Sequence, residues 1–102
     1  MRKSKVFVSG LQAGFLVEME QGKEYYFEYL PGYSGQAVSL TMPVSQQKYV
    51  FGIFPPFFDG LLPEGWQLDA LLKNKKIDRH DYFSQLINVG KDMVGNVTLE
   101  KI

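Results

Sequence analysis

Cysteine is absent from this chain of 102 residues, and histidine occurs once, as His80. Without thiolates the chain can form neither a disulfide framework nor a cysteine-ligated zinc site, and one imidazole cannot build a histidine-rich metal site. These absences exclude cysteine nucleophiles, zinc-binding modules and disulfide-rich scaffolds. We therefore expect no metal, no cofactor and a reducing compartment.

An excess of either charge is also missing, because eleven basic and eleven acidic residues cancel. A chain without net charge has no overall field to attract nucleic acid or an anionic membrane, so we expect no direct DNA binding. The apolar run at residues 6–8 is far shorter than the roughly 7 to 15 residues of a signal-peptide core. No stretch approaches the ~20 apolar residues of a membrane span, and we expect a cytoplasmic protein.

No set of nucleophile, base and charge stabiliser can be assembled from the residues present. His80 lies between Arg79 and Asp81 with no GxSxG motif in the chain, so a solvated surface histidine is the better interpretation. The protein-kinase signatures are missing. Glu18 and Glu20 share one face of an expected strand, where a solvated edge is the expected environment. We predict that the chain is not an enzyme and has no catalytic residue.

What the chain does contain is the composition of one folded domain, and we assign residues 1–102 to it, with 45% hydrophobic and 22% charged residues. Its first third alternates with the period of strands, through Phe15, Val17, Met19, Tyr25, Phe27 and Tyr29. We expect a turn at residues 10–14 and a tight hairpin turn at Gln21 and Gly22. These features predict an antiparallel meander.

The middle of the chain predicts further β-structure. Two prolines and two glycines in residues 31–43 indicate a connection that contains one brief strand at residues 37–42. Another strand is expected at residues 49–54, where Pro55 and Pro56 stop it.

Helical periodicity follows these prolines. The first helix should start with Pro63 and run to about Asn74, and its apolar face holds Leu68, Leu71 and Leu72. The second should have Asp78 as its N-cap and Gly90 at its left-handed end, and its buried residues should be Phe83, Leu86 and Ile87. A last strand is expected at residues 94–102. This order predicts an α+β fold, a small antiparallel β-sheet with two helices packed on one side.

A cluster of aromatic residues on one expected strand permits two interpretations. It consists of Tyr25, Tyr26, Phe27 and Tyr29. Such a face can stack single-stranded bases. However, Glu24 and Glu28 are its neighbours and only Lys23 is basic, so a nucleic-acid platform would lack its phosphate contacts. Packing in the core is the favoured interpretation, and base stacking is the alternative.

Residues 57–66, FFDGLLPEGW, form an apolar run interrupted by two glycines and a proline. Core packing is favoured for Phe57, Phe58, Leu61 and Leu62. Trp66 is different, because at 100° per residue it lies about 200° from Leu68, on the polar side of the helix. A large aromatic residue in that position is either covered by another part of the chain or anchors a partner protein.

Three stretches of the chain, in order, resemble one known family. They are AVSLTMP at residues 37–43, FFDGLLPEGW at residues 57–66 and DYFSQLINVGKDMVGNVTL at residues 81–99. Together they resemble the N-terminal subdomain of HipA-type serine/threonine kinases. The HipA family continues into a kinase body, whereas this chain ends at Ile102, where that body would begin. Asn96 also replaces the small residue that is usual after the last glycine of the motif.

The resemblance implies a function. A free-standing subdomain of this kind is similar to the HipS-like antitoxins of three-component systems, which contain a HipT-like kinase toxin and a HipB-like helix-turn-helix protein. The implied role is to bind and neutralise the kinase, with both other proteins as partners. The alternative is a structural subunit that completes or activates the kinase, or presents its substrate. The expected partner-binding residues are Phe57, Phe58, Asp59, Leu62, Pro63, Glu64, Gly65 and Trp66.

Overall fold

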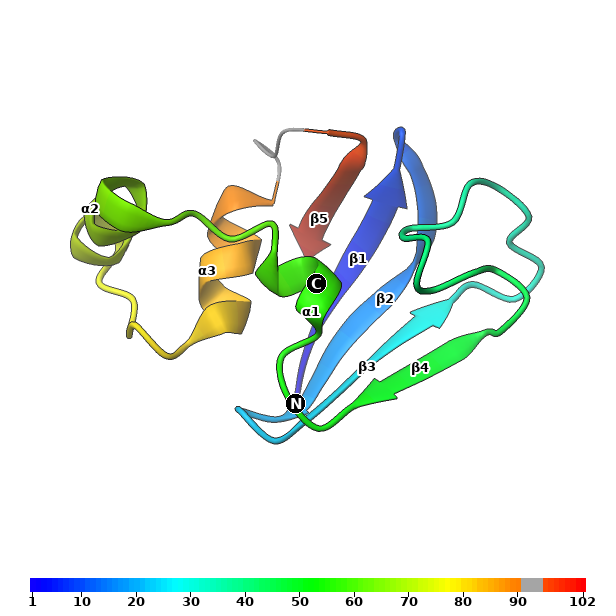
Figure 1. Ribbon diagram of the computed structural model, residues 1–102, viewed down its shortest axis with the longest axis horizontal. Helices are drawn as coiled ribbons and strands as arrows, with labels where there is room; N and C mark the ends of the chain where they lie inside the picture. Colours follow the sequence, from blue (N-terminus) through cyan, green and yellow to red (C-terminus); the bar gives the residue numbers. More distant parts are fainter. Residues whose placement is uncertain (91–94) are drawn as a thin grey trace.

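Five strands of the computed structural model form one antiparallel sheet, in the order β4-β3-β2-β1-β5 (Figure 1). The structure describes residues 1–90 and 95–102. Its elements are β1 (Arg2–Val8), β2 (Leu11–Glu20), β3 (Glu24–Tyr29), β4 (Lys48–Phe51), α1 (Pro56–Asp59), α2 (Gly65–Lys75), α3 (Tyr82–Val89) and β5 (Val97–Lys101). The predicted α+β class, an antiparallel sheet with helices on one side, is confirmed.

The turn between β1 and β2 is shorter than we expected. It holds only Ser9 and Gly10, both at positive φ. Gly14, which we placed at the end of this turn, lies inside β2, and a Cβ atom there would stand 2.1 Å from the carbonyl oxygen of Glu28. Glycine is therefore needed at this position for the close approach of two strands and not for a turn.

The last strand of the chain lies beside the first. β5 is antiparallel to β1, with Leu99 opposite Val6. The expected strand at residues 94–102 is confirmed from Val97 to Lys101, while Val94 lies outside the described residues. The tight turn between β2 and β3 is also confirmed, and Gly22 has a φ of 77° in it.

The core lies between the sheet and the helices α1 and α3. Alternate strand residues point into it, namely Val6, Val8, Leu16, Tyr25, Phe27, Tyr29, Val97 and Leu99. The helices contribute Phe58, Phe83 and Leu86. Each large apolar side chain buried in this way contributes roughly 1.5–3 kcal/mol relative to an exposed position.

The connection between β3 and β4 contains no strand. We expected one at residues 37–42, but only an isolated bridge joins Ser39 to Met42. Backbone groups of this connection bond to tyrosine hydroxyls instead of to a neighbouring strand. β4 is also shorter than expected, because it ends at Phe51. Phe54 turns into the core and packs edge-on against Tyr25, with 5.4 Å between ring centroids.

One helix was missed and another begins later than predicted. α1 is a single turn that Pro56 starts, too short for apolar periodicity to reveal it. α2 begins at Gly65 and not at Pro63, because Glu64 is extended and Gly65 has a φ of 57°. At its end, Lys76 adopts the left-handed conformation that usually belongs to glycine.

α3 begins one turn later than predicted. Its N-cap is Asp81, whose carboxylate accepts a hydrogen bond from the amide of Ser84 at 3.2 Å. The expected cap, Asp78, instead accepts from the amide of His80 at 2.7 Å in the preceding turn. Aspartate is a favoured N-cap residue, so both positions were suitable, and the prediction of Asp78 was wrong.

The other expectations for α3 were partly right. Phe83 and Leu86 are buried and Ile87 is half-buried, while Gln85 is a buried residue that we did not predict. Gly90 has a φ of −58°, so the predicted left-handed end is wrong. A Cβ atom on Gly90 would stand 2.7 Å from the carbonyl oxygen of Leu99, which explains the glycine by its contact with β5.

Candidate partner-binding surface

The segment at residues 57–66 divides into a buried and an exposed part. Phe58 is 0% exposed and packs near Phe27, with 6.1 Å between ring centroids. Its inclusion among the partner-binding residues was therefore wrong, because it is a core residue. Phe57, Leu62 and Pro63 are half-buried, and the remaining residues of the predicted set, Asp59, Glu64, Gly65 and Trp66, are exposed.

Trp66 is 78% exposed at the start of α2. The expectation that it lies away from the leucine face is confirmed, since Leu68, Leu71 and Leu72 are half-buried. No residue of α2 is fully buried, and Figure 1 shows this helix standing at one end of the molecule, beyond α3. An exposed tryptophan on a helix that adds nothing to the core is the kind of feature that marks a binding surface.

Backbone geometry fixes the path of the chain into α2. The amides of Asp59 and Leu62 donate to the carbonyl oxygens of Pro55 and Asp59, so the chain stays in tight turns after α1. Gly65 then adopts positive φ, which a residue with a side chain rarely does. We call the half-buried and exposed residues of this segment the α1–α2 surface: Phe57, Asp59, Leu62, Pro63, Glu64, Gly65 and Trp66.

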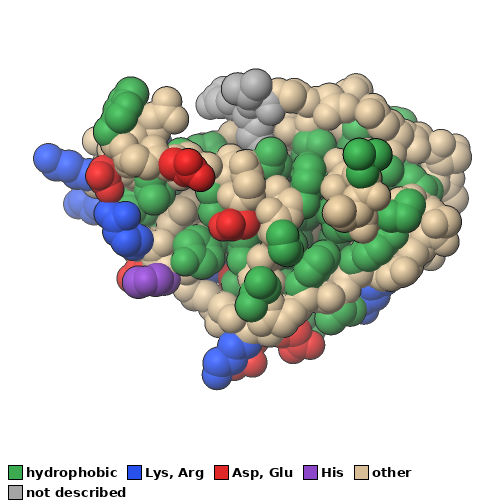
Figure 2. Space-filling model, viewed as in Figure 1, with side chains coloured by type: hydrophobic (Ala, Val, Ile, Leu, Met, Phe, Trp, Pro, Cys, Tyr) green, Lys and Arg blue, Asp and Glu red, His purple; other side chains and the backbone are tan. Residues whose placement is uncertain are grey.

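Charged residues gather at the far end of α2. Figure 2 shows blue, red and purple side chains together at that end of the molecule. Arg79 pairs with Asp69 at 2.8 Å, and both side chains are more than half exposed. Such surface pairs contribute about 0–1 kcal/mol. His80 is exposed, as the sequence predicted.

A partly buried ion-pair network ties β1 and β2 to α3. Arg2 lies 2.6 Å from Glu18 and 2.8 Å from Asp81, and it donates to the hydroxyl of Ser84 at 2.8 Å. The expected solvated edge was wrong for Glu18, which is only 5% exposed, and right for Glu20, which is exposed. Burial raises the pKa of Asp81, but hydrogen bonds from Arg2 and Ser84 outweigh it and leave the pKa below its ordinary value of 3.8.

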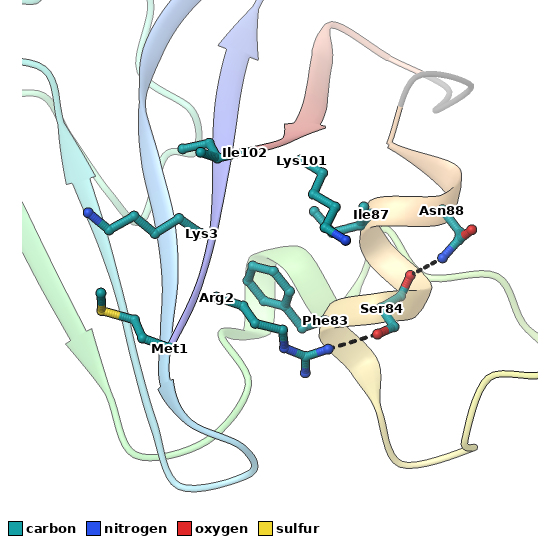
Figure 3. A pocket seen from close by; sticks show the side chains of 9 residues that line it. All are labelled: Met1, Arg2, Lys3, Phe83, Ser84, Ile87, Asn88, Lys101 and Ile102. Carbon is teal, nitrogen blue, oxygen red and sulfur yellow. Dashed lines mark hydrogen bonds between the residues drawn. The ribbon is translucent and has the colours of Figure 1, made fainter.

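A hollow of about 580 Å³ opens beside this network, between α3 and the ends of β1 and β5 (Figure 3). Phe83 and Ile87 form its apolar side, and Ser84 and Asn88 add polar groups. Its Arg2 is already engaged by two carboxylates. Within residues 1–90 and 95–102, no group of three or more His, Cys, Asp or Glu side chains could hold a metal ion. The hollow therefore offers no evident catalytic chemistry.

The aromatic strand does not form a base-stacking platform. Tyr25, Phe27 and Tyr29 are buried in the core. Tyr26 lies on the opposite face of β3, under the ammonium group of Lys48, which stands 4.2 Å from the ring centroid. Core packing, the favoured interpretation of this cluster, is therefore confirmed for Tyr25, Phe27 and Tyr29 and was wrong for Tyr26.

The family model for the HipA N-terminal domain matches residues 4–100. The chain belongs to the HipA N-terminal domain family. A solved structure described as the N-terminal domain of HipA toxin superposes with a TM-score of 0.78 at 34% identity, over 100% of this chain and 93% of that one. A protein of Haemophilus influenzae, described as uncharacterized, is 35% identical over 99% of this chain and 93% of its own length.

These likenesses cover the sheet, the helices and the segment that carries the α1–α2 surface. They place the chain among the N-terminal domains of the HipA family. None of the helices in the described part of the chain is long and apolar enough to cross a membrane.

Proposed function

We propose that this chain is an antitoxin that binds and neutralises a separate HipA-like serine/threonine kinase toxin of the HipT type. The observation that carries the proposal is Trp66, which is 78% exposed on a helix with no buried residue. Membership of the HipA N-terminal domain family supplies the class of partner. The Haemophilus influenzae relative supports a domain that acts by itself, since 93% of its length is aligned.

In this proposal Trp66 is the anchor of the interface. A tryptophan that becomes buried on binding typically contributes 2 kcal/mol or more, as judged by truncation. Pro63 and the positive φ of Gly65 set the direction in which α2 leaves α1, so the indole is presented in one orientation. A kinase that holds Trp66 between its lobes or beside its substrate site is blocked sterically or fixed in an inactive conformation.

The proposal includes a ternary complex in the cytoplasm, in which a HipB-like helix-turn-helix protein supplies the DNA contact. The net charge of zero supports this division of roles, because this chain has no overall field for phosphate groups. No catalytic step is assigned to the chain itself.

Co-expression with the kinase encoded beside it tests the proposal. Wild-type protein should restore host growth and co-purify with the kinase. Trp66→Ala should lower the affinity about 30-fold or more and abolish neutralisation, while its free energy of unfolding should change by less than about 0.5 kcal/mol. Gln67→Ala, at the next position of α2, which is also exposed, is the matched control and should behave as wild type.

Whether kinase activity falls or rises when this chain binds distinguishes an antitoxin from a structural subunit. An antitoxin lowers kinase activity, whereas a structural subunit that completes the kinase raises it or leaves it unchanged. A complex that forms without lowering kinase activity would contradict neutralisation and favour the structural subunit. Absence of any complex would contradict both roles.

A further inference from the structure

The connection between β3 and β4 carries no charged side chain. Residues 30–47 contain no Asp, Glu, Lys, Arg or His, although 22% of the whole chain is charged. Surface loops normally carry charge, and depletion of charge is a property of the centre of protein interfaces. Serine, glycine and glutamine are frequent here instead, and serine and glycine are enriched in loops that bind proteins. We call these residues the charge-free loop.

Leu40 at the tip of this loop is 100% exposed. The side chains two positions away on either side, Val38 and Met42, are buried in the core. Between them the chain turns tightly, with the amide of Met42 donating to the carbonyl oxygen of Ser39 at 3.1 Å. Two inward anchors thus force the leucine outward, and no other part of the described chain covers it.

Three tyrosine side chains, which lie on β3, on β4 and in the loop itself, hold the loop in place. The hydroxyl of Tyr29 donates to the carbonyl oxygen of Met42 and accepts from the amide of Val38 at 2.9 Å. The ring of Tyr33 stacks on Tyr29 with an interplanar angle of 7°. The hydroxyl of Tyr49 donates to Pro43 at 2.6 Å. A leucine presented on such a support loses little conformational entropy on binding, which favours its use as a contact.

The charge-free loop and α1 cover the same face of the sheet. Phe27 packs against Phe58 of α1, and the next inward residue of β3, Tyr29, bonds to the loop. Figure 2 shows hydrophobic side chains spread over the centre and right of this face, with charged ones at the α2 end and along the lower rim and a few acidic ones left of the centre. The loop therefore continues the α1–α2 surface across the molecule.

The α1–α2 surface alone is smaller than a typical protein interface. A stable protein interface involves about 20–30 residues on each side. The α1–α2 surface has only seven residues. The charge-free loop adds sixteen residues that are exposed or half-buried, and the resulting 23 residues fall in the usual range.

We propose that the charge-free loop is the second half of the kinase-binding surface, with Leu40 entering an apolar pocket on the kinase. This inference rests on the proposed function. The chemistry expected of the kinase is an uncharged apolar patch opposite the loop, flanked by basic groups opposite the exposed Asp59 and Glu64. A loop without a single cation does not fit nucleic acid, so the occupant is a protein.

The test measures binding of the purified kinase to Leu40→Asp by calorimetry. The variant should bind at least about ten-fold more weakly than wild type, since it places a charge in an apolar pocket. Val50→Asp is the matched control, because Val50 is 67% exposed and lies opposite Tyr26 on the face of the sheet away from the helices. It should bind within about two-fold of wild type, and Leu40→Met should retain binding. Unchanged far-UV circular dichroism and thermal midpoints would establish that all variants fold.

Each outcome separates the two proposals. Loss of binding by both Leu40→Asp and Trp66→Ala supports them together. If Trp66→Ala loses binding while Leu40→Asp binds as wild type, the proposal that the charge-free loop contacts the kinase is refuted, and the proposed antitoxin function stands. Equal losses for Leu40→Asp and Val50→Asp would also refute it, since any added charge would then suffice. If wild-type protein does not bind the kinase, both proposals fall.

Discussion

Arg2 shows how a single side chain near the start of the chain organises distant elements. Its guanidinium bonds to Glu18 on β2 and to Asp81 and Ser84 at the start of α3, and it stands 5.1 Å from the ring centroid of Phe83. Glu18 is buried, and Arg2 lies 2.6 Å from its carboxylate. Sequence alone could not reveal the cluster, because nothing in the spacing of these residues indicates that they meet.

The network makes stability depend on pH. The pKa of Asp81 is lower in the folded protein than its ordinary value of 3.8, so the folded state binds this proton less readily than the unfolded state. Its contribution to the free energy of unfolding is therefore present above about pH 4 and is lost as the pH falls through the lowered pKa. Asp81→Asn should be less stable than wild type at pH 7.

Urea unfolding at pH 7, 5, 4 and 3 measures this effect. The difference in free energy between wild type and Asp81→Asn should shrink between pH 4 and pH 3. As a control, Asp69→Asn removes an exposed pair with Arg79 and should differ from wild type by less than about 1 kcal/mol at every pH. A difference for Asp81→Asn that stays constant down to pH 3 would show that Asp81 does not carry the dependence.

At the scale of elements, α2 and α3 have similar sequence signals and different positions in the fold. Both showed helical periodicity, yet α3 buries Phe83, Gln85 and Leu86, and α2 buries no residue. α3 is also joined to β5, because the amide of Leu99 donates to the carbonyl oxygen of Gly90 at 3.0 Å. Gly90 is thus a point of close contact between the end of α3 and the sheet.

Gly90→Ala should destabilise the fold by about 1–3 kcal/mol, because the added Cβ atom would stand 2.7 Å from a backbone oxygen that cannot move freely. Gly52→Ala is the control, since a Cβ atom there meets nothing within 4 Å and the residue is not at positive φ. Chemical denaturation should find this variant unchanged or slightly more stable. Equal stability of the two variants would contradict the role assigned to Gly90.

The glycines and the candidate surface show which features of the fold the sequence could predict and which it could not. Local rules identified the turn at Gly22 and the position of Trp66 away from the leucine face, because both depend on nearest neighbours in the chain. Gly14 and Gly90 were misassigned, because each is explained by close approach to another strand, at Glu28 and Leu99. Core packing of Phe58 was the favoured interpretation and is confirmed. The exposure of Trp66 and the extent of the candidate surface across the face depend on tertiary packing, so the sequence alone did not predict them.

At the scale of the whole molecule, α2 and the charge-free loop are far apart. Figure 1 shows α2, which carries Trp66, at one end of the long axis and the loop between β3 and β4 at the other. A partner that spans both would contact Leu40 and Trp66 through separate groups.

Substitutions at these two residues should therefore act independently on kinase binding. The free-energy losses of Leu40→Asp and Trp66→Ala should add in the double variant within about 0.5 kcal/mol, as measured by calorimetry. Combining Leu40→Asp with Gln67→Ala should give no more loss than Leu40→Asp alone. A double variant no weaker than either single variant would indicate that one contact forms only when the other does, against two separate contacts.

Because α2 contributes no buried side chain, changes on its surface are not restrained by the packing of the core. Under the proposed function, copies of such a domain that diverge in α2 would recognise different kinases while the sheet beneath remains the same. Several toxin and antitoxin pairs would then operate in one cell without cross-neutralisation. A helix without a fully buried residue is, in this sense, the part of the fold that is freest to change.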